Sequence, residues 1–177
     1  GAALGSSTVT VNATASTGGT GNNGVPIVAG CATPDATTTM GTLPPFLGVP
    51  IFPTKPSGAV TSYPLLAIPA GKYLGQVAFG TSPKAFSPSN YSLSYSITPC
   101  PGVITPPASS SDYCNMANYV QQNGGTFSWA NNSTYAKLFQ ACFVPNGTQY
   151  YFNVKWTYSS CSSGAPTCGF SITTNTN

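Results

Sequence analysis

Two aspartates are the only carboxylate side chains in the chain, and they limit the acid–base chemistry that it can perform. These are Asp35 and Asp112. The chain of 177 residues also has five lysines but no arginine, glutamate or histidine. General acid–base catalysis needs a side chain whose pKa can be brought near the working pH, usually His, Glu or Asp. Glycoside hydrolysis would need both aspartates across one bond, and a nucleophilic serine would lack its histidine base. The composition therefore predicts that the protein is not an enzyme.

The same residue types argue against metal and nucleic-acid binding. Zinc sites draw on histidine, which is absent, and the cysteines form no closely spaced pair. Asp35 and Asp112 could each give Ca²⁺ an oxygen, but both lie among Ser, Thr and Pro, where turn and capping roles are more common. The net charge is +3, and the lysines are scattered along the chain. We expect no metal, no cofactor and no nucleic-acid partner.

Six cysteines are the residues most suited to covalent chemistry, and they predict disulfides. An even number of cysteines without histidine is typical of a protein in an oxidising compartment. One pair flanks the turn-forming residues 162–167, a second brackets a Pro- and Ser-rich loop, and a third would then be a long-range link. The spacing thus favours three bonds: Cys161–Cys168, Cys100–Cys114 and Cys31–Cys142.

The elements that position these residues are predicted to be strands. Apolar and polar residues alternate strictly over residues 90–98 and 149–158, and turn signals such as Asn-Gly-Gly and Pro-Asn-Gly separate the runs. Shorter runs of the same kind occupy 72–79, 126–129 and 170–174. Short strands punctuated by turns predict an all-β fold, an antiparallel β-sandwich of the jelly-roll or immunoglobulin-like kind, stapled by disulfides.

Two segments depart from this pattern. Residues 112–122 are the one helix candidate, with Asp112 as its N-cap. Residues 42–64 are rich in proline, which predicts an extended or looping segment that cannot occupy a central strand.

The N-terminal residues 1–24 form an extension to the domain predicted for residues 25–177. Residues 6–15 alternate like a strand, and a Gly/Asn-rich stretch tethers them to the domain. This strand has two places to pair: the edge of its own sheet, or the sheet of a neighbouring subunit, which we favour. Its apolar face would make the contact between subunits: Val9, Val11, Ala13 and Ala15.

The composition of the surface is compatible with two functions, packing between subunits and sugar binding. With 23 Thr, 21 Ser and only 4% charged residues, copies of the chain repel each other weakly, and a contact between them desolvates few charges. Stability should also depend little on pH. The 21 aromatic residues favour the alternative hypothesis, in which exposed rings bind sugars. The candidate glycan contacts are Trp129 and Tyr151. Trp156 is not a candidate, because it shares a strand face with Phe152 and is predicted to lie in the core.

Other sequence signals concern export. No basic or apolar leader is present, and Gly1-Ala2-Ala3 fits the cleavage site of a signal peptide already removed. No apolar run approaches the length of a membrane span. Five Asn-x-Ser/Thr sequons are candidate N-glycosylation sites: Asn12, Asn90, Asn131, Asn132 and Asn146.

Three motifs resemble a loosely defined group of uncharacterised secreted bacterial β-sandwich proteins. They are Tyr-Ser-Ile-Thr-Pro-Cys-Pro-Gly at 95–102, Pro-Asn-Gly-Thr-Gln-Tyr-Tyr at 145–151 and Cys-Gly-Phe at 168–170. The group usually has an acidic residue after Pro-Gly, where this chain has Val103. The resemblance covers about residues 65–173 and implies secretion and a β-sandwich, but no activity. By its alternation and position, the N-terminal strand also resembles the donor strands of donor-strand-exchange pilins.

Together these features predict a secreted structural protein at the cell surface. We expect subunits to form an extracellular, pilus-like filament as residues 6–15 add to the sheet of the next copy. The alternative is a monomeric adhesin or carbohydrate-binding module whose aromatic residues contact cell-surface glycans.

Overall fold

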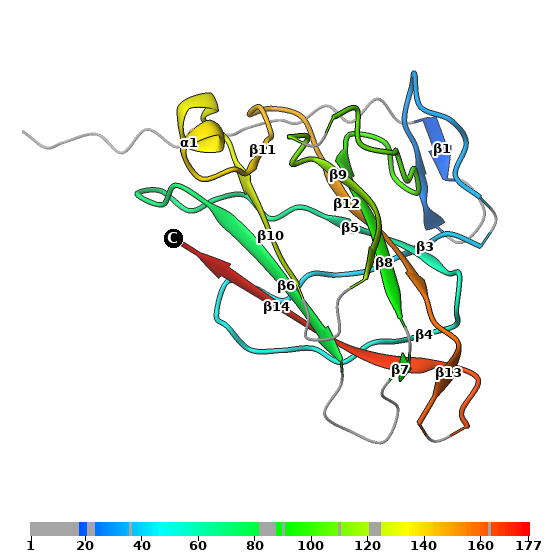
Figure 1. The fold of residues 1–177 in the computed structure, drawn as a ribbon. Helices are drawn as coiled ribbons and strands as arrows, with labels where there is room; N and C mark the ends of the chain where they lie inside the picture. The colour runs from blue at the N-terminus through cyan, green and yellow to red at the C-terminus, as the bar shows by residue number, and fades with distance from the viewer. Residues whose placement is uncertain are drawn as a thin grey trace, which may run out of the picture.

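The computed structural model is a sandwich of two five-stranded sheets (Figure 1). The structure describes residues 18–20, 24–35, 37–81, 88–89, 91–109, 111–120, 125–162 and 164–177. The first sheet has the order β11 (Cys142–Phe143), β10 (Gly125–Ala130), β6 (Gly75–Thr81), β14 (Cys168–Thr176) and β4 (Thr54–Lys55). The second has the order β3 (Thr39–Met40), β5 (Val60–Pro64), β12 (Tyr151–Thr157), β8 (Ser92–Thr98) and β9 (Asn115–Val120).

Smaller elements decorate the two ends of the sandwich. The helix α1 (Ser133–Leu138) lies beside β11 at one end, and β7 (Pro88–Ser89) pairs with β13 (Ser160–Cys161) at the other (Figure 1). A further pair joins β1 (Gly18–Thr20) to β2 (Pro26–Ile27).

The predicted all-β sandwich is confirmed, and the five alternating runs all contain strands. The sheets are mixed rather than wholly antiparallel, because β10 pairs with β11, and β3 with β5, in parallel. The predicted strand at 6–15 lies outside the described residues.

Aromatic side chains from both sheets meet in the core. Trp156 of β12 stacks on Phe170 of β14 with ring centroids 3.7 Å apart, and Phe79 of β6 stacks on Phe152 of β12 at 5.1 Å. Such pairs contribute about 0.5–1.5 kcal/mol each beyond the area they bury. Because each pair joins one sheet to the other, the apolar faces of the alternating strands are the faces that the two sheets turn toward each other.

Part of the outer face of the second sheet is also buried, around Asn153, which the alternating pattern did not predict. Asn153 of β12 is fully buried there, and its side-chain oxygen accepts hydrogen bonds from Ser62 Oγ at 2.7 Å and from the N–H of Gly102 at 2.8 Å. Its Nδ2 donates to the carbonyl of Cys100 at 2.9 Å and to that of Val103 at 3.2 Å. These bonds hold the loop after β8 flat against the sheet.

That loop overturns two of the predicted disulfides. The bonds are Cys31–Cys100, Cys114–Cys142 and Cys161–Cys168, so only the last pairing is confirmed. Cys100–Cys114 is wrong because the loop between them folds over the sheet, where Cys100 meets the segment that carries Cys31. Cys114 lies beside β8, where its carbonyl accepts from the N–H of Ile97 at 2.7 Å. The predicted Cys31–Cys142 bond is also wrong, because each of its cysteines pairs with another residue.

The helix expected at 112–122 is also wrong. Its described part contains β9, which pairs with β8, and Asp112 caps a turn instead. The helix found among the described residues is α1, whose N-cap Asn132 accepts from the N–H of Thr134 at 2.8 Å and of Tyr135 at 3.3 Å. Pairing with a neighbouring strand outweighs weak local propensity in residues 115–120.

The expectation that residues 42–64 cannot form a central strand is wrong at their C-terminal end. Strand β5 lies between β3 and β12, and its proline is the last residue, Pro64. The remainder contains the edge strand β4 and otherwise irregular backbone with bends and a turn, which fits the expected extended or looping segment.

Three disulfides place the folded protein in an oxidising compartment, which fits secretion. Among the described residues, no helix is long and apolar enough to cross a membrane.

Candidate functional site

One side of the sandwich is closed by the proline-rich segment, and we call it the closed side. Residues 48–53 run along the outer edge of β14: Ile51 and Ile172 exchange two backbone hydrogen bonds of 2.9 Å, and Gly48 N–H donates to Thr174 at 3.2 Å. Strands β4 and β3 end the two sheets on this side with two residues each, joined by a 3.1 Å bond from Lys55 Nζ to Thr39 Oγ1. Prolines, lysine and short edge strands all hinder pairing with another chain.

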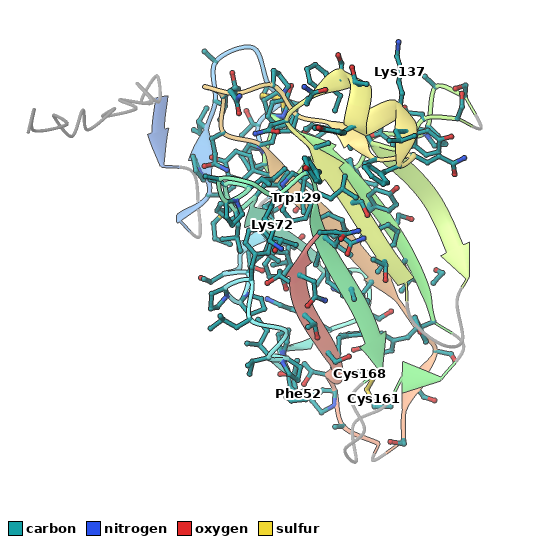
Figure 2. The ribbon with its side chains drawn as sticks, turned by 90° about the vertical axis from the view of Figure 1, so that its left-hand side faces the viewer. Phe52, Lys72, Trp129, Lys137, Cys161 and Cys168 are labelled. Atoms are coloured by element: carbon teal, nitrogen blue, oxygen red, sulfur yellow. A yellow bond between two sulfur atoms is a disulfide. The ribbon has the colours of Figure 1, made fainter. Side chains whose placement is uncertain are left out.

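The opposite side, the open side, is formed by β9 and by residues 125–128 of β10. In Figure 2, β9 lies at the right-hand margin and β14 lies to the left of β6 and β10. Strand β9 pairs with β8 alone, while β11 covers only Trp129 and Ala130 of β10. In the part of the chain that the structure describes, no strand pairs with the outer edge of β9. The sequences of the two segments, Asn-Met-Ala-Asn-Tyr-Val and Gly-Thr-Phe-Ser, contain no charge and no proline.

Asp112 fixes the start of β9. Its Oδ1 accepts from the N–H of Cys114 at 3.0 Å, and its Oδ2 accepts from Asn115 Nδ2 at 2.7 Å and from the N–H of Ala108 at 3.3 Å. Partial burial opposes ionisation of Asp112, but these hydrogen bonds outweigh it and lower the pKa of the carboxyl. The carboxylate is therefore a structural cap at one end of the open edge.

Asp35 has a similar local role. It accepts from the N–H of Thr37 at 2.8 Å and from its hydroxyl at 2.9 Å, and these bonds lower its pKa. Each aspartate therefore stabilises the turn in which it lies. No cluster of three or more metal-binding side chains occurs among the described residues.

A cavity opens at the α1 end of the sandwich, and we call it the end cavity. It has a volume of about 290 Å³, and Trp129 lines it together with residues 65–68, which follow β5, and 144–150, which precede β12. Its apolar lining includes Leu65, Leu66, Ile68, Val144 and Tyr150, and its polar lining includes Asn131, Asn146, Thr148 and Gln149. No Lys or Asp lines it, so the cavity is chemically suited to a neutral occupant.

Gly75 makes room for the indole that lines this cavity. A Cβ at position 75 would lie 2.3 Å from two ring atoms of Trp129. Trp129 also contacts Phe46 of the proline-rich segment, with ring centroids 6.0 Å apart. Figure 2 shows Trp129 in the upper half of the molecule and the Cys161–Cys168 disulfide at the lower end.

The two predicted glycan contacts are not surface residues, so the expectation that their rings are exposed is wrong. Trp129 is 2% exposed and Tyr151 is 7% exposed. Trp129 follows Phe127 at an interval of two and shares its inward face, a signal that the sequence contained. Burial raises the pKa of the Tyr151 hydroxyl.

Three of the five sequon asparagines gather near the end cavity. Asn131 and Asn146 line it, and Asn132 caps α1; all three are exposed. Asn12 and Asn90 lie outside the described residues, as do Val9, Val11, Ala13 and Ala15. Glycosylation of these sites stays a prediction.

Sequence reasoning missed an exposed apolar patch around α1. Leu138 is 68% exposed, and Phe139, Phe143 and Tyr73 are also exposed. Tyr73 packs against Tyr135 of α1 with ring centroids 4.6 Å apart. An apolar patch beside so few charges is a surface on which copies of the chain can pack.

The fold and these features define a disulfide-bonded, all-β sandwich with one protected side and one unprotected side. No family model and no curated protein matches the chain. Among solved structures, it is similar to PliG of Aeromonas hydrophila, a periplasmic inhibitor of g-type lysozyme, with 12% identity and a TM-score of 0.34. The match covers 79% of this chain and 99% of PliG. A likeness at this level supports no inference about function.

Proposed function

We propose that the protein is the structural subunit of an extracellular, pilus-like filament that assembles by strand addition between copies. The observation that carries the proposal is the difference between the two sides of the sandwich. Prolines, short strands and Lys55 protect the closed side, whereas the open side presents the outer edge of β9, which no described strand covers and which contains no proline or charge. An exposed edge of this kind is a template for pairing with another chain.

The strand that pairs with this side is residues 6–15 of another copy. Main-chain hydrogen bonds would provide most of the affinity, and the alternating face of Val9, Val11, Ala13 and Ala15 would set the register. The donor and acceptor are different surfaces of the same chain. Such a heterologous contact continues from copy to copy and produces a fibre unless the rotation closes a ring.

The composition is compatible with this role. With 4% charged residues, few charges lose water when subunits pack side by side. Three disulfides constrain the unfolded chain and so favour a durable subunit. The chain supplies little of the acid–base chemistry that an enzyme needs, which supports a structural rather than a catalytic role.

Negative-stain electron microscopy with light scattering tests the proposal. The full chain should form fibres with a regular repeat, and the double variant Val9→Asp/Val11→Asp should stay as 18 kDa monomers. The matched control is Thr8→Asp/Thr10→Asp, which places the same charges on the opposite face of the strand and should still form fibres. Monomers of the full chain, or fibres from the Val9→Asp/Val11→Asp variant, would contradict strand addition.

The end cavity favours a second candidate function, a glycan-binding adhesin. It combines aromatic and aliphatic walls with the exposed amides of Asn131 and Asn146 and contains no charged side chain, which suits a neutral sugar. This function predicts a compact monomer that binds glycans on an array. Binding should be lost in Tyr150→Ala and kept in Tyr113→Ala, since Tyr113 is exposed and does not line the cavity.

A further inference from the structure

We infer that the outer edge of β9, in the second sheet, is the acceptor for residues 6–15 of a second copy. This inference rests on the proposed strand addition and specifies which edge receives the strand. The sandwich has four edge strands, β11 and β4 in the first sheet and β3 and β9 in the second. Each can be judged by its length, its sequence and its neighbours.

Three of the four edges are poor acceptors. β3 and β4 have two residues each, and the proline-rich segment continues the edge formed by β4. β11 also has two residues and is followed within two positions by Pro145. The pairing of β11 with β10 covers only Trp129 and Ala130 of β10. A two-residue strand offers too few hydrogen bonds to hold a partner chain.

β9 is the long edge; it is paired along one side and held at its start. It has six residues and pairs along one side with β8. At its start, Cys114 is bonded to Cys142 of β11, and the Asp112 carboxylate accepts from the N–H of Cys114. A held edge loses less entropy when a second strand pairs with it than a mobile edge would.

The register of β9 is irregular at one point. Met116 lies opposite Tyr95 and Tyr119 opposite Leu93, so β9 has one extra residue between them. Bulges of this kind increase strand twist and interrupt regular pairing. The irregularity therefore restricts the register that an added strand can adopt along this edge.

Residues 6–15 fit this edge in length and in charge. Ten residues of strand span about 33 Å and the six residues of β9 about 20 Å, so the donor covers the whole edge with several residues to spare. Neither segment carries a charged side chain or a proline. Only residues 16 and 17 separate the donor from β1, a reach of about 11 Å when extended, so successive subunits must pack closely.

Hydrogen–deuterium exchange of the full chain, measured before and after assembly, tests the assignment. Amides of residues 115–120 should exchange about tenfold or more slowly in the fibre, because a paired edge strand opens less often. Amides of 39–40 and 54–55 on the closed side are the internal control and should change little. Fibres in which residues 125–128 become protected and 115–120 do not would overturn the β9 assignment and leave strand addition intact.

A pair of lysine variants gives an independent readout. Asn118→Lys places a charge on β9, and Thr126→Lys places the same charge on β10, where Thr126 is exposed. Lysine on an edge strand hinders pairing, so the critical concentration for assembly should rise about tenfold in Asn118→Lys, equivalent to about 1.4 kcal/mol, and stay unchanged in Thr126→Lys. The reverse order would overturn the inference, whereas a full chain that forms no fibres would overturn the proposed function itself.

Discussion

Cys114 and Cys142 are joined by a disulfide that connects the edges of the two sheets on the open side of the sandwich. Their Cα atoms are 4.6 Å apart; Cys114 directly precedes β9 and Cys142 begins β11. The bond therefore crosses from one layer to the other where no proline-rich segment covers the edge. It holds the two unprotected edges in a fixed relation to each other.

Replacing both of these cysteines by alanine should lower stability and assembly together. The residues are 28 positions apart, and the chain-entropy model gives about 3–4 kcal/mol for a loop of that length. Urea denaturation measures the loss, and light scattering measures assembly. Removal of Cys161–Cys168, with a separation of 7, should cost about 2–3 kcal/mol and leave assembly of the folded protein unchanged. Equal effects of the two removals on assembly would show that the Cys114–Cys142 bond has no special role at the open side.

Gly75→Ala should destabilise the protein through a clash with Trp129. The added Cβ would lie 2.3 Å from the indole, and overpacking of this kind costs about 1–3 kcal/mol. Gly80→Ala in the same strand is the control, because its Cβ would meet only the Ser171 hydroxyl at 2.9 Å. Thermal unfolding should give a clearly lower Tm for the first variant than for the second. Similar values would mean that the indole can move aside.

Asn153→Ala should be among the most destabilising single substitutions. It removes the acceptor of the Ser62 hydroxyl and the Nδ2 donor to the carbonyls of Cys100 and Val103, in a region that is fully buried at Asn153. The N–H of Gly102 keeps Ser62 Oγ as its acceptor at 2.7 Å. Leaving buried polar groups unsatisfied costs on the order of 3 kcal/mol here. Asn175→Ala, at an exposed position of β14, should change stability by less than about 0.5 kcal/mol. Chemical denaturation compares them, and a near-neutral Asn153→Ala would mean that water replaces the amide.

These contacts also show how far the sequence could predict the fold. Alternation located five of the strands, though not β9, because it reflects burial of one face of a strand, as in Phe152, Val154 and Trp156. It could not show that Asn153, on the other face, is buried too. That burial depends on a loop folding back over the sheet, and nothing local in residues 99–103 specifies its direction.

The candidate site was predicted less completely than the fold. Cys161–Cys168 was predictable because a turn brings the two residues together, while the other two bonds depend on long-range topology. The open side could not be predicted, because β9 reads locally as a weak helix and becomes a strand only by pairing with β8. The prolines of the closed side were visible in the sequence, but the sequence did not show which strand edge they would cover.

Stability should fall at low pH only within a narrow window. The pKa values of Asp35 and Asp112 are lowered in the folded protein, so their contribution is complete above the unfolded value near 4 and is lost as pH falls through the folded pKa. Stability measured by urea should be flat from about pH 5 to 8 and decline below about pH 4. Asp112→Asn should show a shallower decline than the unsubstituted protein. A loss of stability between pH 5 and 8 would contradict the assignment, since no histidine can titrate there.

Assembly should be nearly insensitive to salt. Neither β9 nor residues 6–15 carry a charge, so screening has little to act on when the Debye length falls from about 10 Å at 0.1 M to about 3 Å at 1 M. The critical concentration, measured by sedimentation of fibres, should therefore stay constant across that range. Thr8→Asp/Thr10→Asp is the informative control, because its new carboxylates interact with subunits whose net charge is positive, and its critical concentration should rise with salt. A strong salt dependence of the unsubstituted chain would mean that lysines and aspartates hold the subunits together, and strand addition along an uncharged edge would then be wrong.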